Sequence, residues 1–193
     1  MAVSFLWHID MDPKKLRKSY MQILPQLNKA LHEVQSKLSD VPPANFTLET
    51  GIKPYSSAKR KMLEHRIVDP IELPDLVRGR LYFSEDYSVK EVLDLLKKVF
   101  GKKLTKAKKK DTNECGLSYS GVTDVNLDCD GVQFELQLMP QSFQPHQGLA
   151  HEIHDKLRSN KVKLSDEEKE FLKHTHNKLF KTLDVKSKAL KED

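Results

Sequence analysis

Apolar residues recur through residues 13–39 at intervals of three and four, the spacing of one face of an α-helix. The apolar positions are Leu16, Tyr20, Ile23, Leu24, Leu27, Leu31, Val34 and Leu38. This pattern predicts one long amphipathic helix. Pro42 and Pro43 follow it, so we expect the helix to end within residues 40–44.

Shorter patterns predict the elements that follow. Alternating apolar residues predict strands, helical spacing predicts helices, Gly101 is a helix stop, and Ser165 with Glu168 forms a capping box. In chain order we expect a strand at 45–53, a short basic helix at 55–65, a strand at 73–83, a helix at 88–100, a lysine-rich loop, a hairpin of strands at 116–127 and 132–139, a helix at 148–159 and a last helix after residue 165.

This order of helices and strands predicts an α+β domain, close to the α/β class, in which helices flank one small mixed β-sheet. A chain of 193 residues with 38% hydrophobic residues is long enough to bury a substantial core. We therefore expect a single domain over residues 1–193, with its core at 46–158 and helical extensions at 12–40 and 165–190.

Composition gives the expected environment. No run of 18 apolar residues is present, so no segment is expected to span a membrane. Asp10 and Asp12 interrupt the apolar N-terminal stretch and no basic region precedes it, so no signal peptide is expected. Cys115 and Cys129 fit neither a CxxC pair nor a disulfide framework, which favours free thiols in a reducing cytoplasm, while a single bridge between them stays open.

Positive charge is unevenly distributed. The net charge is +5, and six lysines lie between residues 102 and 110. A cluster of this density favours a polyanionic partner, such as a nucleotide or a nucleic acid.

Two carboxylates lie at predicted strand ends: Asp75 in LPDLVRGRLYF and Glu135 in VQFELQLMP. In each segment the apolar residues occupy one face, so the carboxylate lies on the other face or at the end of the strand. A carboxylate in such a place is best explained by a metal or a proton transfer that uses it. Together, Asp75 and Glu135 are candidate ligands for Mg²⁺.

A series of motifs between residues 53 and 158 resembles the synthetase domain of the RelA/SpoT family, the pyrophosphokinases that make alarmones. The motifs are a basic segment KPYSSAKRKM, the strand D-L-V-x-x-R, a helix, a Lys-Asp pair at 110–111, a tyrosine-bearing strand, the strand E-L-Q-L and a histidine-bearing helix. The resemblance implies a nucleotidyltransferase-type fold. It also implies transfer of the β,γ-pyrophosphate of ATP to the 3′-hydroxyl of a purine nucleotide, as in (p)ppGpp or (p)ppApp synthesis, by a small stand-alone synthetase or a toxin-like homologue.

The resemblance also implies roles for individual residues. Lys53, Ser57 and Lys61 match positions that bind the ATP phosphates, and Arg80 is expected to reach the triphosphate from the same strand as Asp75. The implied catalytic and Mg²⁺-binding pair is Asp75 and Glu135, with Glu135 as the base. The residues implied for the acceptor nucleotide are Tyr119, Gln137, Lys110 and His151.

Each of these residues also has a plain structural interpretation. The basic segment can be a solvated helix face, and Asp75 can begin a strand after Pro74. Glu135 can lie on the solvent face of an antiparallel strand, and Tyr119 can pack on a neighbour in the sheet. The resemblance favours the functional interpretation for Asp75 and Glu135.

The remaining histidines give weaker signals. His151 and His154 form H-E-x-H, one residue short of the zinc motif H-E-x-x-H, so a zinc site is not expected. His174 and His176 are expected to be surface residues on different sides of the last helix.

The chain departs from the family pattern at several positions. Gly51 stands where the family has an arginine that faces the adenine, Thr123 stands for a histidine, and Met139 stands for an arginine. Two alternatives therefore remain open: a toxin that pyrophosphorylates the 3′ end of tRNA, and a catalytically degenerate homologue that only binds nucleotide or RNA. A homo-oligomer or an antitoxin partner is also left open.

Overall fold

The computed structural model describes residues 12–39, 41, 46–110, 112–113, 115–158 and 163–189, with side chains as far as residue 184. Its centre is a five-stranded sheet in the order β1-β2-β5-β4-β3. The strands are β1 (Thr47–Ile52), β2 (Val77–Phe83), β3 (Leu104–Lys109), β4 (Thr123–Cys129) and β5 (Val132–Pro140). β2 and β5 are parallel and the other neighbours are antiparallel, so the sheet is mixed, as predicted.

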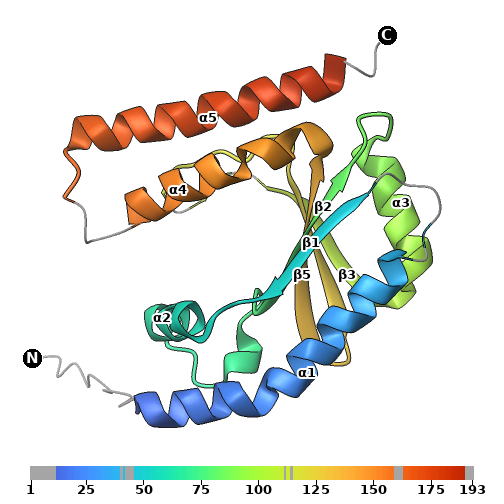
Figure 1. The fold of residues 1–193 in the computed structure, drawn as a ribbon, viewed down its shortest axis with the longest axis vertical. Coiled ribbons are helices and arrows are strands. Elements are labelled where there is room, and N and C mark those ends of the chain that lie inside the picture. Colours follow the sequence, from blue (N-terminus) through green and yellow to red (C-terminus); the bar gives the residue numbers. More distant parts are fainter. Residues whose placement is uncertain are drawn as a thin grey trace, which may run out of the picture.

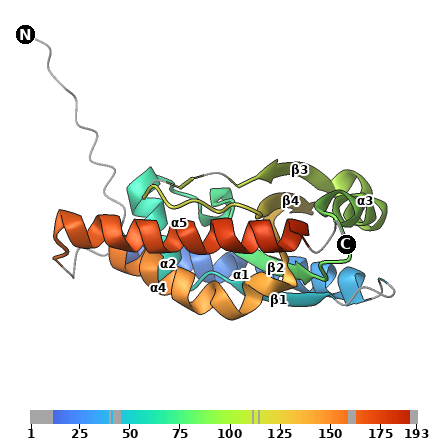
Figure 2. The same cartoon turned by 90° about the horizontal axis from the view of Figure 1, so that it is seen from above.

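Helices cover the sheet unequally. They are α1 (Pro13–Ser39), α2 (Tyr55–His65), α3 (Val89–Phe100), α4 (Gln147–Arg158) and α5 (Asp166–Ala189). Three short 3₁₀ segments, η1 (Pro70–Glu72), η2 (Gly101–Lys103) and η3 (Gln141–His146), join them to the strands. Figure 1 shows α1 and α3 on one side of the sheet and α4 and α5 on the other, and Figure 2 shows α4 and α5 running side by side.

The two faces of the sheet have opposite chemistry because side chains alternate along each strand. On β5, Phe134, Leu136 and Leu138 are fully buried in the core under α1 and α3. Glu135 and Gln137 lie between them and face the other side, where they are only half-buried. The apolar face therefore fixes the orientation of the polar face, and a shift of register by one residue would exchange the two.

Local sequence explains the ends of the elements. Ser88 and Glu91 form the capping box that begins α3, and Ser165 and Glu168 make the same pair of bonds before α5. The β4–β5 turn contains Asp130 and Gly131, both at positive φ, as a two-residue type I′ hairpin requires. The predicted helices and the first strand are confirmed.

Three local predictions were wrong. The lysine-rich segment is not a loop but the edge strand β3, whose backbone pairs with β4 while its lysines face solvent. The hairpin begins at Thr123, so Tyr119 lies in a loop before the strand, where the Asn113 side chain accepts bonds from the backbone N–H groups of Cys115 and Leu117. Asp75 precedes β2 in a turn, because the strand begins only at Val77.

The prediction that His176 lies at the surface was wrong. Its side chain is fully buried. Its ring stacks on Phe180, with centroids 4.6 Å apart, and meets the edge of Tyr119 at 5.1 Å. Neither ring nitrogen has a hydrogen-bond partner in the described part of the chain. The reason is that α5 lies over the loop of Tyr119, which the sequence pattern of α5 alone does not reveal.

We expect His176 to make stability fall at acidic pH. Burial lowers the pKa of His176 from the ordinary 6.5, so below pH 6.5 the unfolded chain takes up a proton that the folded chain resists. The stability that comes from burying the neutral His176 side chain is fully present above pH 6.5, and it is lost as the pH falls toward the lowered pKa. Urea unfolding measures the free energy of unfolding at pH 7.5 and at pH 5.5. Between these two pH values it should fall less in His176→Leu than in wild type.

The exposed neighbour supplies the control for this test. His174→Leu removes an imidazole from the solvent side of α5 and should keep the wild-type pH dependence. An equal loss of stability in wild type and His176→Leu would contradict the assignment to His176.

Among the described residues, no helix has the length and apolar character needed to cross a lipid bilayer.

Candidate active site

A cavity of about 390 Å³ lies on the polar side of the sheet, between α2 and α4. Every side chain that the sequence predicts for the site lines it: Lys53, Ser57, Lys61, Asp75, Arg80, Lys110, Tyr119, Glu135, Gln137 and His151. They come from α2, β2, β5, α4 and the segments next to β1, β2, β3 and β4. The structure thus brings the predicted donor, metal and acceptor residues to one place.

Asp75 is held by two lysines of the cavity. Lys61 Nζ lies 2.8 Å from its Oδ2, and Lys53 Nζ donates to the same oxygen. Burial by itself would raise the pKa of Asp75, but hydrogen bonds from the two lysines outweigh burial and lower it. The carboxylate is therefore ionised, with two ammonium groups beside one of its oxygens.

The second oxygen of this carboxylate is a candidate metal ligand. Asp75 Oδ1 is buried and has no hydrogen-bond partner in the described residues. A buried oxygen of this kind is costly unless something binds it, and carboxylate oxygen is the ligand that Mg²⁺ prefers. No cluster of three or more His, Cys, Asp or Glu side chains with metal-binding spacing occurs in the described part of the chain. The donor set fits Mg²⁺ that is also held by substrate phosphates and water, which is how this ion is usually bound at nucleotide sites.

Glu135 lies in the middle of β5, with Arg78 of β2 and Asn126 of β4 opposite it in register. Desolvation raises the pKa of Glu135, and the nearby Asp75 and Asp124 carboxylates act in the same direction against the charges of the lysines. A carboxylate with a raised pKa accepts protons more readily than an exposed one. The position and the environment of Glu135 therefore suit a general base.

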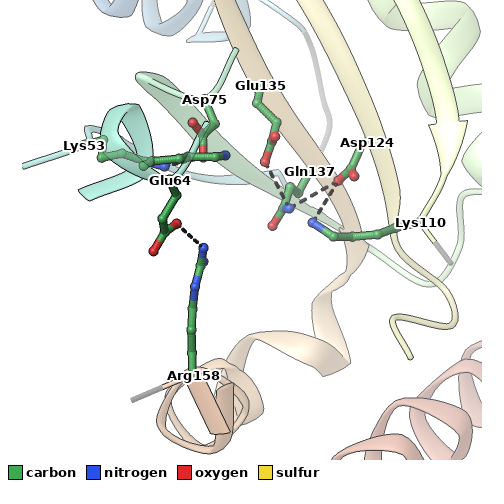
Figure 3. A network of polar contacts seen from close by, with 9 residues as sticks. Lys53, Glu64, Asp75, Lys110, Asp124, Glu135, Gln137 and Arg158 are labelled. Carbon is green, nitrogen blue, oxygen red and sulfur yellow. Dashed lines mark hydrogen bonds and ion pairs between the residues drawn. The ribbon is translucent and has the colours of Figure 1, made fainter. Parts of the chain in front are cut away.

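A chain of polar contacts continues from Glu135 toward β3 (Figure 3). Gln137 Nε2 lies 3.3 Å from Glu135 Oε1 and 3.2 Å from Asp124 Oδ1, and Lys110 Nζ lies 3.5 Å from the same Asp124 oxygen. The Lys110 ammonium also lies 4.9 Å from the centroid of the Tyr119 ring, within cation–π range. This side of the cavity therefore combines an aromatic ring, a cation and an amide group.

Tyr119 packs against an apolar cluster under α5 that includes Phe143, Phe180 and Leu183. Its ring meets Phe180 edge-on at 5.2 Å, and Asn113 Nδ2 lies 3.4 Å from its hydroxyl. Burial raises the pKa of Tyr119, so the phenol stays protonated at neutral pH. The ring is held in place although it lies in a loop.

The opposite wall is formed by α2 and α4. Glu64 of α2 accepts from Arg60 at 2.7 Å and from Arg158 of α4 at 3.0 Å, and Figure 3 shows the bond between Glu64 and Arg158. His151 Nδ1 lies 3.0 Å from Asp155 Oδ2 on α4. No side chain among the described residues caps the start of α2, which leaves its first N–H groups available to a phosphate.

Sequence reasoning missed several residues of the site, among them Arg78 and Asn113, which line the cavity, and Asp124, which contacts the lining residues Gln137 and Lys110. Arg78 is two positions before Arg80, so strand alternation alone would have placed both on one face. Asp124 has the same signal on β4, whereas nothing in the sequence pattern places Asn113 beside Tyr119. Arg78 and Arg80 also line a second cavity of about 280 Å³ over β1 and β2.

The departures from the family pattern have different structural settings. Gly51 lines the second cavity, and Met139 is buried in the wall of the first. Thr123 is buried on the side of β4 that faces away from Asp124, so it does not line either cavity. Asp111, the second member of the Lys-Asp pair, lies outside the described residues.

Comparison with known proteins identifies the fold. No protein-family model matches the chain, and no curated protein sequence does. Among solved structures, small alarmone synthetase 1 from Bacillus subtilis, bound to its product pppGpp, matches with a TM-score of 0.62 and 16% identity, over 91% of this chain and 97% of that chain. This chain has the small alarmone synthetase fold.

Two further structures agree. Small alarmone synthetase 2 from Bacillus subtilis matches with a TM-score of 0.63 and 18% identity, over 90% of this chain and 98% of that chain. A GTP pyrophosphokinase family protein from Streptococcus pneumoniae matches with a TM-score of 0.55 and 19% identity, over 93% of each chain. The α+β class and the RelA/SpoT-type synthetase fold predicted from sequence are confirmed.

Proposed function

We propose that this chain is an ATP-dependent pyrophosphokinase that transfers the β,γ-pyrophosphate of ATP to the 3′-hydroxyl of a purine nucleotide. The observation that carries the proposal is the cavity in which Asp75, with one unpartnered buried oxygen, and Glu135, with a raised pKa, lie among the cations that a triphosphate needs. The small alarmone synthetase fold supports the same reaction class.

On the donor side, the phosphates meet Lys53, Lys61 and Arg80, with the Ser57 hydroxyl and the start of α2 beside them. These groups neutralise the triphosphate and hold the β-phosphorus in place for attack. Mg²⁺ bound at Asp75 and Glu135 would supply further positive charge to the phosphate oxygens.

On the acceptor side, the 3′-hydroxyl oxygen attacks the β-phosphorus of ATP, and the bond from this phosphorus to the α-phosphate oxygen breaks. Glu135 takes the proton of the hydroxyl, AMP leaves with the bridging oxygen, and the acceptor carries the pyrophosphate. Glu135 suits this role because it lies between the lysines around Asp75 and the polar chain that leads to Lys110.

Tyr119 and Lys110 position the acceptor in this proposal. The Lys110 ammonium covers the Tyr119 ring, at 4.9 Å from its centroid. An acceptor base that stacks on the ring would displace the ammonium, which would then be free to bind the acceptor phosphates. Stacking on a tyrosine is tolerant of the base, so the ring does not choose between guanine and adenine.

The test is incubation of the protein with γ-labelled ATP, Mg²⁺ and, in separate tubes, GDP, GTP, ADP, AMP and bulk tRNA, each beside Glu135→Gln. We expect label on one nucleotide, release of AMP and no transfer by the variant. No transfer in any tube, with ATP binding retained, would contradict the proposal and favour a protein that only binds nucleotide.

One structural observation supports an RNA acceptor as the second candidate. Lys106 and Lys108 of β3 are exposed and pair in register with Asn126 and Asp124, so they share the polar face and form a row that ends at Lys110 in the cavity. A row of lysines along an edge also protects a sheet from aggregation, which is its alternative role.

Salt dependence separates these two roles of the β3 lysines. We expect transfer to a free nucleotide to be unchanged in Lys106→Glu/Lys108→Glu, because a nucleotide in the cavity does not reach these positions. Transfer to tRNA, if it occurs, should fall about tenfold or more in this variant and decline steeply between about 50 and 200 mM salt. Lys90→Glu, an exposed lysine on α3, is the matched control.

A further inference from the structure

The last helix, α5, contributes no described side chain to either cavity, yet it packs against the segment that carries Tyr119. We call residues 115–122, which lead into β4, the Tyr119 loop. This loop contains neither a helix nor a ladder strand. A ring in such a segment has a defined position only where other parts of the molecule hold the backbone, so the contacts of α5 with the loop bear on the acceptor side of the site.

Asn177 of α5 binds the backbone of the Tyr119 loop on both sides of Leu117. Its Oδ1 accepts from the Ser118 N–H at 2.7 Å, and its Nδ2 donates to the carbonyl oxygen of Gly116 at 3.3 Å. The side-chain amide of Asn177 thus pairs with one donor and one acceptor of the loop, as a neighbouring strand would. The shorter of the two bonds fixes the residue directly before Tyr119.

A second bond holds the loop on the other side of the ring. Ser120 Oγ donates to Asp184 Oδ2 at 2.8 Å. Asn177 and Asp184 are about two helical turns apart, so both side chains project from the same face of α5. The two residues that flank Tyr119 in the sequence are therefore each bonded to the same helix.

The Tyr119 ring also contacts α5 directly. His176 and Phe180 stack on one another with their centroids 4.6 Å apart, and their planes meet that of Tyr119 at 74° and 66°. Tyr119 nevertheless lines the larger cavity, where the Lys110 ammonium lies 4.9 Å from its centroid. The ring is therefore supported by α5 and still reaches the cavity.

The Tyr119 loop follows the surface of α5 closely. Gly121 has a φ of +83°, which a side chain rarely allows. A Cβ at this position would lie 2.9 Å from Phe143 Cζ and 3.1 Å from Asp184 Oδ1, which is too close for both atoms. Glycine at 121 is what lets the loop pass this near to the helix and reach the bonds that Asn177 and Asp184 offer.

We propose that Asn177 is a positioning residue for the acceptor nucleotide, because it holds the loop so that the Tyr119 ring is in place before the base arrives. The proposal rests on the proposed function, which assigns stacking of the acceptor base to Tyr119. A loop that is ordered beforehand loses less conformational entropy when a ligand binds, so the acceptor binds more tightly. The donor side does not use this loop, since Lys53, Lys61 and Arg80 come from other parts of the fold.

The first test measures KM for ATP and KM for the labelled acceptor separately in Asn177→Ala. We expect KM for the acceptor to rise about three- to tenfold, the effect of losing a hydrogen bond, while KM for ATP stays at the wild-type value. Asn177→Asp keeps an oxygen that accepts from Ser118, so it should bind the acceptor more tightly than Asn177→Ala. Asn28→Ala removes the same side chain from an exposed position on α1 and is the matched control. An equal rise in both KM values, or no rise in either, would overturn the proposal.

Hydrogen exchange followed by mass spectrometry tests the loop without any turnover. The Ser118 N–H is bonded to Asn177, so peptides that contain Ser118 should exchange faster in Asn177→Ala than in wild type. Peptides from β5 should keep the wild-type rate, which shows that the variant is folded. Unchanged exchange at Ser118 would mean that α5 does not hold the loop, and the proposal would be wrong.

Failure of the proposal differs from failure of the proposed function. If wild type transfers pyrophosphate and the loop of Asn177→Ala exchanges faster, but KM for the acceptor is unchanged, the positioning role is wrong and the reaction stands. If wild type labels no acceptor, the reaction is wrong, and titration with GDP and ADP decides the positioning role. Weaker binding by Asn177→Ala supports this role, whereas equal binding, or no binding by wild type, overturns it.

Discussion

Replacing Glu135 with glutamine is expected to lower kcat for pyrophosphate transfer by a factor of about 10²–10⁴, the usual contribution of a general base. The amide has nearly the same shape, and its oxygen can still accept from Gln137, but it does not take a proton at neutral pH. ATP binding should remain measurable, because Lys53, Lys61 and Arg80 are untouched. Single-turnover transfer of γ-label and titration with ATP measure the two quantities separately.

The pH profile gives an independent check on the base. Since desolvation raises the pKa of Glu135, the acid limb of kcat/KM should have its midpoint above the ordinary glutamate value of 4.5. Lys110 lowers this pKa and Asp124 raises it, so Lys110→Met should move the limb to higher pH and Asp124→Asn to lower pH. Equal turnover of Glu135→Gln and wild type, or no response of the limb to either charge, would contradict the role of Glu135.

The sequence predicts the elements of this fold well because each has a local signal. α1 and α3 carry apolar stripes at helical spacing, and Ser88 and Ser165 begin helices with capping boxes. β3 lacks such a signal: its lysines and Ala107 show no apolar face, and only pairing with β4 makes it a strand. Local sequence cannot report a partner that lies elsewhere in the chain.

The same limit applies to the site. The order of the motifs was enough to select residues that line one cavity. The resemblance to a family with a known fold indicates which distant residues lie together, whereas periodicity indicates only helices and strands. Arg78 was missed although it alternates with Arg80, since the opposing Gly51 is known only from the β1–β2 register. His176 was misplaced because its burial depends on the path of the Tyr119 loop.

The largest expected effect on stability comes from Asp75→Asn. This change removes the negative charge beside Lys53, whose side chain is only 8% exposed, and beside the less buried Lys61. Loss of one partner of a buried ion pair leaves the other charge without compensation, so we expect the free energy of unfolding to fall by about 3 kcal/mol. Urea unfolding at pH 7 measures this change, and turnover should be lost as well.

Two controls separate structure from chemistry in this variant. Lys53→Met/Asp75→Asn also removes the buried ammonium, so it should recover much of the stability but none of the turnover. The exposed pair Lys90 and Asp94 serves as the surface comparison, and its neutralisation should leave stability nearly unchanged, because solvent screens an exposed ion pair. A double variant as unstable as the sum of both single changes would show that the two groups do not interact.

The stability lost in Asp75→Asn should depend on pH in a defined direction. Burial lowers the pKa of Lys53 from the ordinary 10.5, while the hydrogen bond from Lys53 to Asp75 acts against burial and raises it. Without the carboxylate the folded-state pKa falls further, and the unfolded chain binds more protons between that pKa and 10.5. Stability of the variant therefore rises with pH across this window, and its deficit relative to wild type narrows toward pH 10. A deficit that stays constant from pH 7 to 10 would show that Lys53 is not the source of the instability.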